Sequence, residues 1–215
     1  MHSTIQNKFI KGKLSEFIIK QIKGNKTRFF TLTAFALGLM FIGIFIFSRL
    51  HTINDAASVR LASAFTFFSS GEQKKGFALI NETISQFSKT PAAYQARLIK
   101  ADILTVMHKY DEALKILTET LENGTPDIIK PLASSRIIYV YDSQKNYFDA
   151  IVASREFIDK YPDHFLTGDI HLNLAEYYIL TRSKDNAVSV FADVLVKFPA
   201  TNEAETAQNK LNQLK

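Results

Sequence analysis

Two histidines and two aspartates lie close together in the carboxyl-terminal half of the chain: Asp163, His164, Asp169 and His171. Imidazole nitrogens and carboxylate oxygens are the groups that bind zinc and related divalent metals. The spacing of these four residues matches no known ligand set, and His171 falls near the packing face of an expected helix. The pattern therefore favours structural histidines, and we expect no metal site.

The motifs that would carry other chemistry are absent from the sequence. There is no cysteine to act as a nucleophile, and no HExxH, GxSxG or glycine-rich phosphate-binding motif occurs. Catalysis requires several such groups to converge on one site. We therefore expect a protein that is not an enzyme, that binds no cofactor, and whose function depends on its surfaces.

A nineteen-residue stretch from Phe29 to Phe47 contains no charged residue. Roughly 20 apolar residues are needed to cross the hydrocarbon layer of a bilayer, which is about 30 Å thick. A core helix of a soluble domain would keep one polar stripe, whereas this stretch is apolar all round apart from Thr31 and Thr33. Its length and composition therefore favour a membrane span over a buried helix.

A cleaved signal peptide is the main alternative, because a basic leader precedes the apolar stretch. Signal peptides have apolar regions of about 7 to 15 residues, followed closely by a cleavage site between small residues. The candidate pair, Ala56 and Ala57, lies well past the end of the stretch, and the lack of cysteine excludes a lipid-modified terminus. We therefore expect an uncleaved transmembrane helix at residues 29–48.

The positive charge of the chain is concentrated before this stretch. Residues 1–28 contain seven lysines and arginines and one glutamate, a net charge of +6, whereas the whole chain carries +5 and the remainder therefore −1. Basic residues next to a span stay on the cytoplasmic face. We expect a cytoplasmic leader at 1–28 and export of the rest, and the near-neutral remainder argues against nucleic-acid binding.

The leader has apolar residues at helical spacing, from Ile10 to Ile22, with lysines on the opposite side. This pattern is compatible with a helix lying on anionic lipid headgroups. Gly12 and Gly24 weaken such a helix, and favour the alternative that the charge serves only to set the topology.

The chain beyond residue 50 repeats every 37 residues. Gly76, Ala113, Ala150 and Ala187 occupy one small-residue column. Two apolar columns keep the same step. One contains Ile84, Leu121, Ile158 and Leu195, and the other contains Phe67, Leu104, Tyr141 and Tyr178. Three prolines close the units: Pro126, Pro162 and Pro199. Apolar residues recur at three-and-four spacing with little strand-like alternation, so we expect stacked helical hairpins.

These residues resemble the tetratricopeptide repeat, a helix-turn-helix unit of about 34 residues. The last unit supplies the leucine-alanine pair (Leu174 and Ala175), the aromatic Phe191 and the closing Pro199; the first unit matches least. The resemblance implies an all-α chain with about four hairpins at 57–202 and a capping helix at 203–215. Residues 49–56 would form a short linker or helix extension, with Asn54 or Asp55 as the cap of the first repeat helix.

The tetratricopeptide resemblance also implies a partner-binding inner wall made by the first helix of each hairpin. The register of the family gives these candidates for partner binding: Gln95, Leu98, Asp102, Thr105, Leu132, Ser135, Tyr139, Asp142, Asp169, Leu172, Glu176 and Ile179. The set mixes acidic and apolar residues and lacks the lysine-asparagine pattern that clamps a terminal carboxylate. An ordinary solvated face is the alternative interpretation.

The plan of basic leader, single span and exported repeats resembles the ancillary Sec-translocon subunit family of bacterial inner membranes. That resemblance implies an adaptor with protein partners, namely translocon components, exported chains or a periplasmic folding factor. The carboxyl-terminal repeats also resemble modules of outer-membrane assembly and Tol-Pal-associated proteins, which implies a structural scaffold in the envelope as the alternative. Self-association through Ala34 and Gly38 of the span is a third hypothesis.

Overall fold

The computed structural model describes residues 26–214, and the predicted amphipathic leader lies outside these residues. The chain divides into two units, up to Thr52 and from Ile53 onward. Throughout the described residues the secondary structure is helical, with nine helices and no strand. The prediction of an all-α fold is confirmed.

Helix α2 (Lys26–Ser69) contains the predicted span. The large apolar side chains from Phe30 to Phe47 are each at least half exposed, and none of the apolar window is buried in the protein. The hydroxyls of Thr31 and Thr33 donate to the carbonyls of Arg28 and Phe29, so these polar side chains are satisfied within the helix. By length and composition, this helix can cross a membrane.

The predicted helix cap at Asn54 or Asp55 is wrong. Both residues lie inside α2, which continues to Ser69, and the carbonyl of Asn54 accepts a hydrogen bond from the hydroxyl of Ser58 one turn later. Residues 49–56 are therefore helical. No glycine or proline interrupts this segment, so no strong helix-ending residue opposes the continuation of α2.

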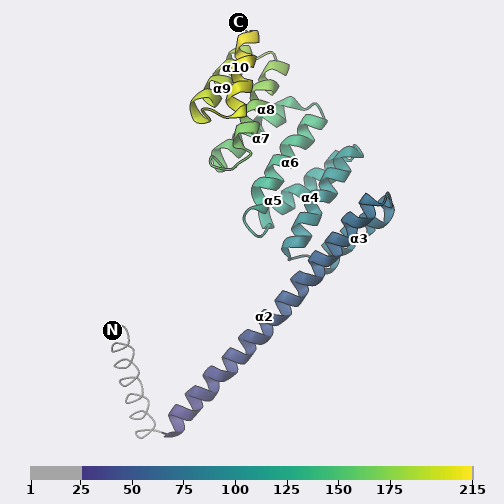
Figure 1. The fold of residues 1–215 in the computed structure, drawn as a ribbon, viewed down its shortest axis with the longest axis vertical. Helices are drawn as coiled ribbons and strands as arrows, with labels where there is room; N and C mark the ends of the chain where they lie inside the picture. Colours follow the sequence, from purple (N-terminus) through teal and green to yellow (C-terminus); the bar gives the residue numbers. More distant parts are fainter. Residues whose placement is uncertain (1–25, 215) are drawn as a thin grey trace, which may run out of the picture. The chain divides into compact units, whose positions relative to one another are not determined.

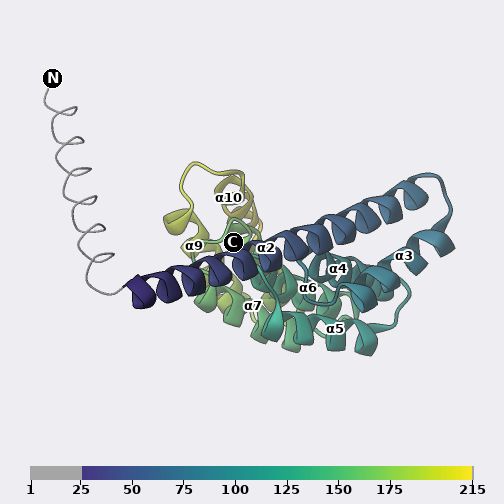
Figure 2. The ribbon, with the colours of Figure 1, turned by 90° about the horizontal axis from the view of Figure 1, so that it is seen from below.

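From Ile53 onward the helices form antiparallel hairpins stacked in chain order (Figure 1). The end of α2 packs against α3 (Gln73–Gln86) in one buried cluster. Helix α4 (Pro91–Val106) pairs with α5 (Tyr110–Asn123), α6 (Ile129–Ser143) with α7 (Tyr147–Lys160), and α8 (Thr167–Leu180) with α9 (Lys184–Lys197). Helix α10 (Asn202–Leu214) packs last, against α9 and α8. Figure 2 shows α4 and α6 on one side of this stack and α5 and α7 on the other. In this part of the stack, α4 and α6 therefore form one layer and α5 and α7 another.

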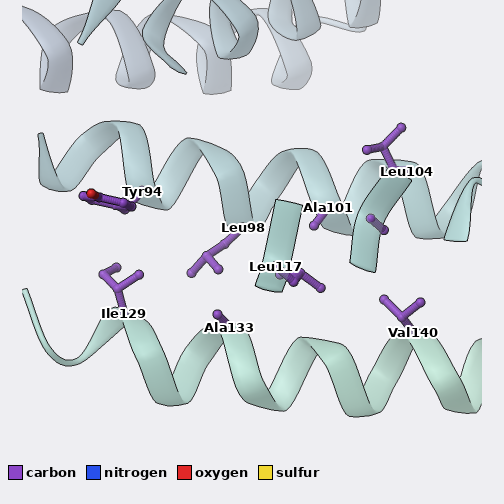
Figure 3. Packing of buried hydrophobic residues seen from close by; sticks show 9 residues of the cluster. Tyr94, Leu98, Ala101, Leu104, Leu117, Ile129, Ala133 and Val140 are labelled. Atoms are coloured by element: carbon purple, nitrogen blue, oxygen red, sulfur yellow. The ribbon is translucent and has the colours of Figure 1, made fainter. Parts of the chain in front are cut away.

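The core follows the repeat. The small-residue column from Gly76 to Ala187 is buried throughout. Figure 3 shows Leu98 and Ala101 of α4 facing Ala133 of α6, with Leu117 of α5 between the two helices. A second column with the same 37-residue step is also inaccessible to solvent: Ile80, Leu117, Ser154 and Phe191. The small side chains let the helices approach closely, and the large ones fill the layer between them.

Each hairpin closes through the same backbone turn. The second residue after the end of the first helix has a left-handed conformation in each hairpin, at Gly71, His108, Lys145 and Arg182, with φ angles of 81°, 59°, 58° and 60°. The next N–H donates to a carbonyl five residues back, as in Lys109 to Leu104 at 2.8 Å and Asn146 to Tyr141 at 2.9 Å. This is a Schellman ending, which satisfies carbonyls at the helix terminus.

The turns between hairpins are longer and vary in length, covering residues 87–90, 124–128, 161–166 and 198–201. They contain Pro126, Pro162 and Pro199, so the predicted role of these prolines in closing each unit is confirmed. At the first of these turns, the Thr90 hydroxyl accepts from the Ala93 N–H, and Pro91 begins α4. Proline suits this position because its missing N–H would be unpaired there in any case.

Candidate partner-binding groove

A groove of about 530 Å³ lies between α6 and α8, the first helices of the last two hairpins. Its lining residues recur three or four positions apart on each helix, so each helix contributes one face. The lining consists of Ser135, Ile138, Tyr139 and Asp142 from α6, together with Leu166, Asp169, Ile170, Asn173, Glu176, Tyr177 and Leu180 from α8 and the turn before it.

The groove is acidic. Asp142, Asp169 and Glu176 line it, and no lysine, arginine or histidine does. Burial raises the pKa of the Asp142 carboxyl, and no ion pair of Asp142 or Asp169 occurs within residues 26–214. Glu176 differs, because it accepts from Lys210 of α10 at 2.6 Å. Two of the three carboxylates are therefore open to a cation from elsewhere.

Tyr177 and two apolar side chains complete the groove. Tyr177 is 5% exposed and stacks on Tyr147, with ring centroids 6.0 Å apart. Burial, then the charge of Asp142, raises the pKa of the Tyr177 phenol, and its hydroxyl has no hydrogen-bond partner among the described residues. Tyr139 and Leu180 are 50% and 54% exposed. The groove thus combines apolar surface with unsatisfied polar groups, as binding sites do.

Five of the sequence candidates line this groove: Ser135, Tyr139, Asp142, Asp169 and Glu176. Two of the four candidates on α4 are accessible to solvent. Gln95 is exposed, whereas Asp102 is half-buried and accepts from the Nε of Arg136 at 3.0 and 3.1 Å. Burial raises the pKa of Asp102, and Arg136 offsets part of that effect. Asp102 therefore ties α4 to α6.

The assignment of Leu98 and Thr105 to the inner wall is wrong. Both are 3% exposed; Leu98 packs in the core between α4 and α6, and the Thr105 hydroxyl donates to the Ala101 carbonyl at 2.8 Å. Helix α4 packs against three helices, α3, α5 and α6, so its buried stripe is wider than the family register implies. Three further candidates are half-buried and pack at the edges of core clusters: Leu132, Leu172 and Ile179.

Sequence reasoning missed six of the lining residues: Ile138, Leu166, Ile170, Asn173, Tyr177 and Leu180. Three of the six follow a predicted residue by three or four positions: Ile138 follows Ser135, Asn173 follows Asp169 and Leu180 follows Glu176. Extending each predicted position along its own helical face would have found these three. The signal was present, but it does not separate groove residues from core residues such as Ile138 and Ile170, which are nearly inaccessible.

The two histidines near this region are structural. His171 is 3% exposed; its Nδ1 lies 2.7 Å from the Thr167 carbonyl and its Nε2 3.5 Å from the Lys197 Nζ. The Nδ1 of His164 accepts from the N–H of Leu166 at 3.3 Å. Burial lowers the pKa of both side chains. Within the described chain, no three groups of metal-binding type converge.

Comparison with known proteins supports the repeat assignment. Residues 133–164, which include most of α6 and all of α7, match the profile of the family described as "Tetratricopeptide repeat". The stack of hairpins has the same architecture. The solenoid is tetratricopeptide-like.

Solved structures resemble this tetratricopeptide-like solenoid in fold. A tetratricopeptide repeat protein from Parabacteroides merdae aligns with a TM-score of 0.59 and 14% identity over 74% of this chain and 60% of its own. A putative kinesin light chain from Podospora anserina aligns with a TM-score of 0.59 and 12% identity, over 75% of this chain and 85% of its own. A MamA protein from Desulfovibrio magneticus RS-1 aligns with a TM-score of 0.53 and 15% identity, over 68% of this chain and 77% of its own. No curated protein sequence matches the chain.

Proposed function

We propose that this protein is a membrane-anchored adaptor that binds protein partners through the groove between α6 and α8. Tetratricopeptide-like solenoids mediate protein–protein interactions, which supports the general assignment. The single observation that carries it is the groove itself, because a half-exposed tyrosine and leucine line it beside two carboxylates without a counter-ion. Exposed apolar surface combined with unpaired charge in one hollow favours a binding site over a solvated face.

The anchor in this proposal is the apolar part of α2, within residues 29–48. The basic leader holds the amino end in the cytoplasm of a bacterium, and the solenoid lies on the exported side of the inner membrane. The partners are translocon components, exported chains or a membrane-associated folding factor. Confining the groove to the membrane surface raises its effective concentration to roughly the millimolar range, so weak contacts are sufficient for binding.

Two measurements test the proposal. A periplasm-active reporter enzyme fused after residue 214 should be active, and the same fusion to a chain lacking 29–48 should not; a reporter active only in the cytoplasm contradicts the topology. Purification of the full chain from gently solubilised membranes should recover protein partners that a groove variant, Tyr139→Ala with Leu180→Ala, does not recover. A mature amino terminus beyond Ala57, together with outer-membrane partners, would instead favour the envelope scaffold.

A further inference from the structure

The groove between α6 and α8 has carboxylates on both of its walls. Asp142 comes from α6 and Asp169 and Glu176 come from α8, and no cationic side chain lines the groove between them. Glu176 has an ion pair with Lys210, whereas Asp142 and Asp169 have none within residues 26–214. The groove therefore leaves negative charge unpaired on two facing walls.

A second observation points into the same hollow. Tyr177 is 95% buried, lines the groove, and leaves its hydroxyl without a partner in residues 26–214. The hydroxyl oxygen itself is open to solvent, because the buried unpaired polar atoms of the described side chains belong to Ser154, Tyr161 and His164 instead. Asp142 is close enough for its charge to act on Tyr177. A ligand that donates hydrogen bonds to Asp142 and also reaches the Tyr177 oxygen would replace water at both groups.

The arrangement selects among cations. A metal ion requires three or more ligands that converge on one point, and no such set exists among the described side chains. A lysine ammonium has three donors and an arginine guanidinium has five, spread over a larger area. These donors suit carboxylates on two walls better than a single ion does. The exposed faces of Tyr139 and Leu180 would contact an apolar side chain next to the cation.

We propose that the groove receives a lysine or arginine side chain of the partner between Asp142 and Asp169, with an adjacent apolar side chain against Tyr139 and Leu180. This inference rests on the proposed function and names the chemistry of the partner segment. Glu176 contributes less, because Lys210 already neutralises it. The groove thus distinguishes a basic, apolar segment from an acidic or purely polar one.

The test uses the full chain in nanodiscs of phosphatidylcholine, a neutral lipid that does not attract basic peptides. The probes are fluorescein-labelled nine-residue peptides of one scaffold, with Lys, Arg, Gln or Glu at the centre and either leucines or serines beside it. Fluorescence anisotropy measures the affinity of each. The Lys-Leu and Arg-Leu peptides should bind about tenfold more tightly than the Gln-Leu peptide, and the Glu-Leu peptide more weakly still.

The variants assign this preference to the groove. Asp142→Asn with Asp169→Asn should reduce the tenfold preference to less than about twofold, and Asp169→Asn alone, at an exposed position, should reduce it in part. The matched control is Glu119→Gln with Glu156→Gln, which removes two exposed carboxylates from α5 and α7. The preference should persist in the control. Circular dichroism checks that each variant folds.

The possible failures are distinguishable. If peptides bind, and Leu180→Ala weakens them, but lysine gives no advantage over glutamine, the charge inference is wrong while the proposed function stands. If the control variant loses the preference as fully as the groove variant, the attraction is general and the inference is wrong. If no peptide binds, or if neither Tyr139→Ala nor Leu180→Ala weakens the binding that is seen, the inference and the groove proposal fail together.

Discussion

Replacing Lys145 with glycine should stabilise the solenoid. Lys145 lies in the left-handed conformation at the turn between α6 and α7, with a φ of 58°, and its side chain is exposed. The equivalent position of the first hairpin is already glycine, Gly71. Glycine adopts this conformation without the steric cost that a Cβ atom imposes. The hydrogen bond from the Lys145 N–H to the Asp142 carbonyl involves only the backbone and is retained.

The magnitude follows from two opposing terms. The left-handed conformation costs a residue with a Cβ about 1–2 kcal/mol. Glycine avoids this steric cost, but it lowers the free energy of unfolding by about 0.5–1 kcal/mol, because a glycine has more conformational freedom to lose when the chain folds. The net gain in the free energy of unfolding is about 0.5–1 kcal/mol. For a domain of this size that corresponds to an increase in Tm of about 1–4 °C.

The assay is thermal unfolding of the full chain in mild detergent, followed by far-ultraviolet circular dichroism. Lys145→Ala is the matched control, because it removes the same charge and side chain but keeps the Cβ atom; its Tm should stay within about 2 °C of the wild type. Arg182→Gly, at the same position of the last hairpin, should repeat the gain. The account of the turn is refuted if Lys145→Ala stabilises as much as Lys145→Gly, or if neither glycine variant raises the Tm.

Further predictions concern the buried layer and pH. Ser154→Ala should raise stability by about 1 kcal/mol, because the hydroxyl is buried without a partner; a loss of stability would contradict this. Leu117→Ala, in the same column, should cost about 2–5 kcal/mol in urea unfolding, and a cost below about 1 kcal/mol would show that the site is not packed as described. Burial holds the pKa of His164 and His171 below the ordinary 6.5, so the unfolded chain binds more protons and stability should fall as the pH drops below about 6.5. A Tm that is equal at about pH 7.5 and pH 5.5 would contradict this burial of neutral histidines.

The repeat period and the helical class could be predicted from the sequence because burial imposes them on residue type. The small column of Gly76, Ala113, Ala150 and Ala187 marks the closest helix contacts, and the structure buries all four. The prolines likewise marked the variable turns. Both signals are local and repeat at a fixed step, so four imperfect copies were sufficient to reveal them.

The turns within the hairpins could not be found in this way. Their left-handed position is glycine only at Gly71, and His108, Lys145 and Arg182 give no conformational signal at the other three. The continuation of α2 through Asn54 was missed for the opposite reason, because asparagine favours a cap but does not compel one.

The groove was predicted in part. Tyr139, Asp142 and Asp169 were identified from the family register, whereas Leu98 and Thr105 were misplaced. The register gives the direction of a side chain relative to its own helix. Whether that side chain lies in a groove or in the core depends on the distance to the first helix of the neighbouring hairpin. The sequence of a single repeat does not specify this distance. The register therefore placed five candidates of α6 and α8 in the groove, but it also selected Leu132, Leu172 and Ile179, which pack at core edges, and Leu98 and Thr105, which are buried.

Crosslinking in living cells tests the central claim most directly. A photoreactive amino acid is placed at Tyr139 in the groove, or at Val152, which is similarly exposed on α7 but does not line the groove. After irradiation of intact cells, position 139 should give a discrete adduct with a protein partner that position 152 does not give. No protein adduct at position 139, or the same adduct with equal yield at position 152, would contradict binding in the groove.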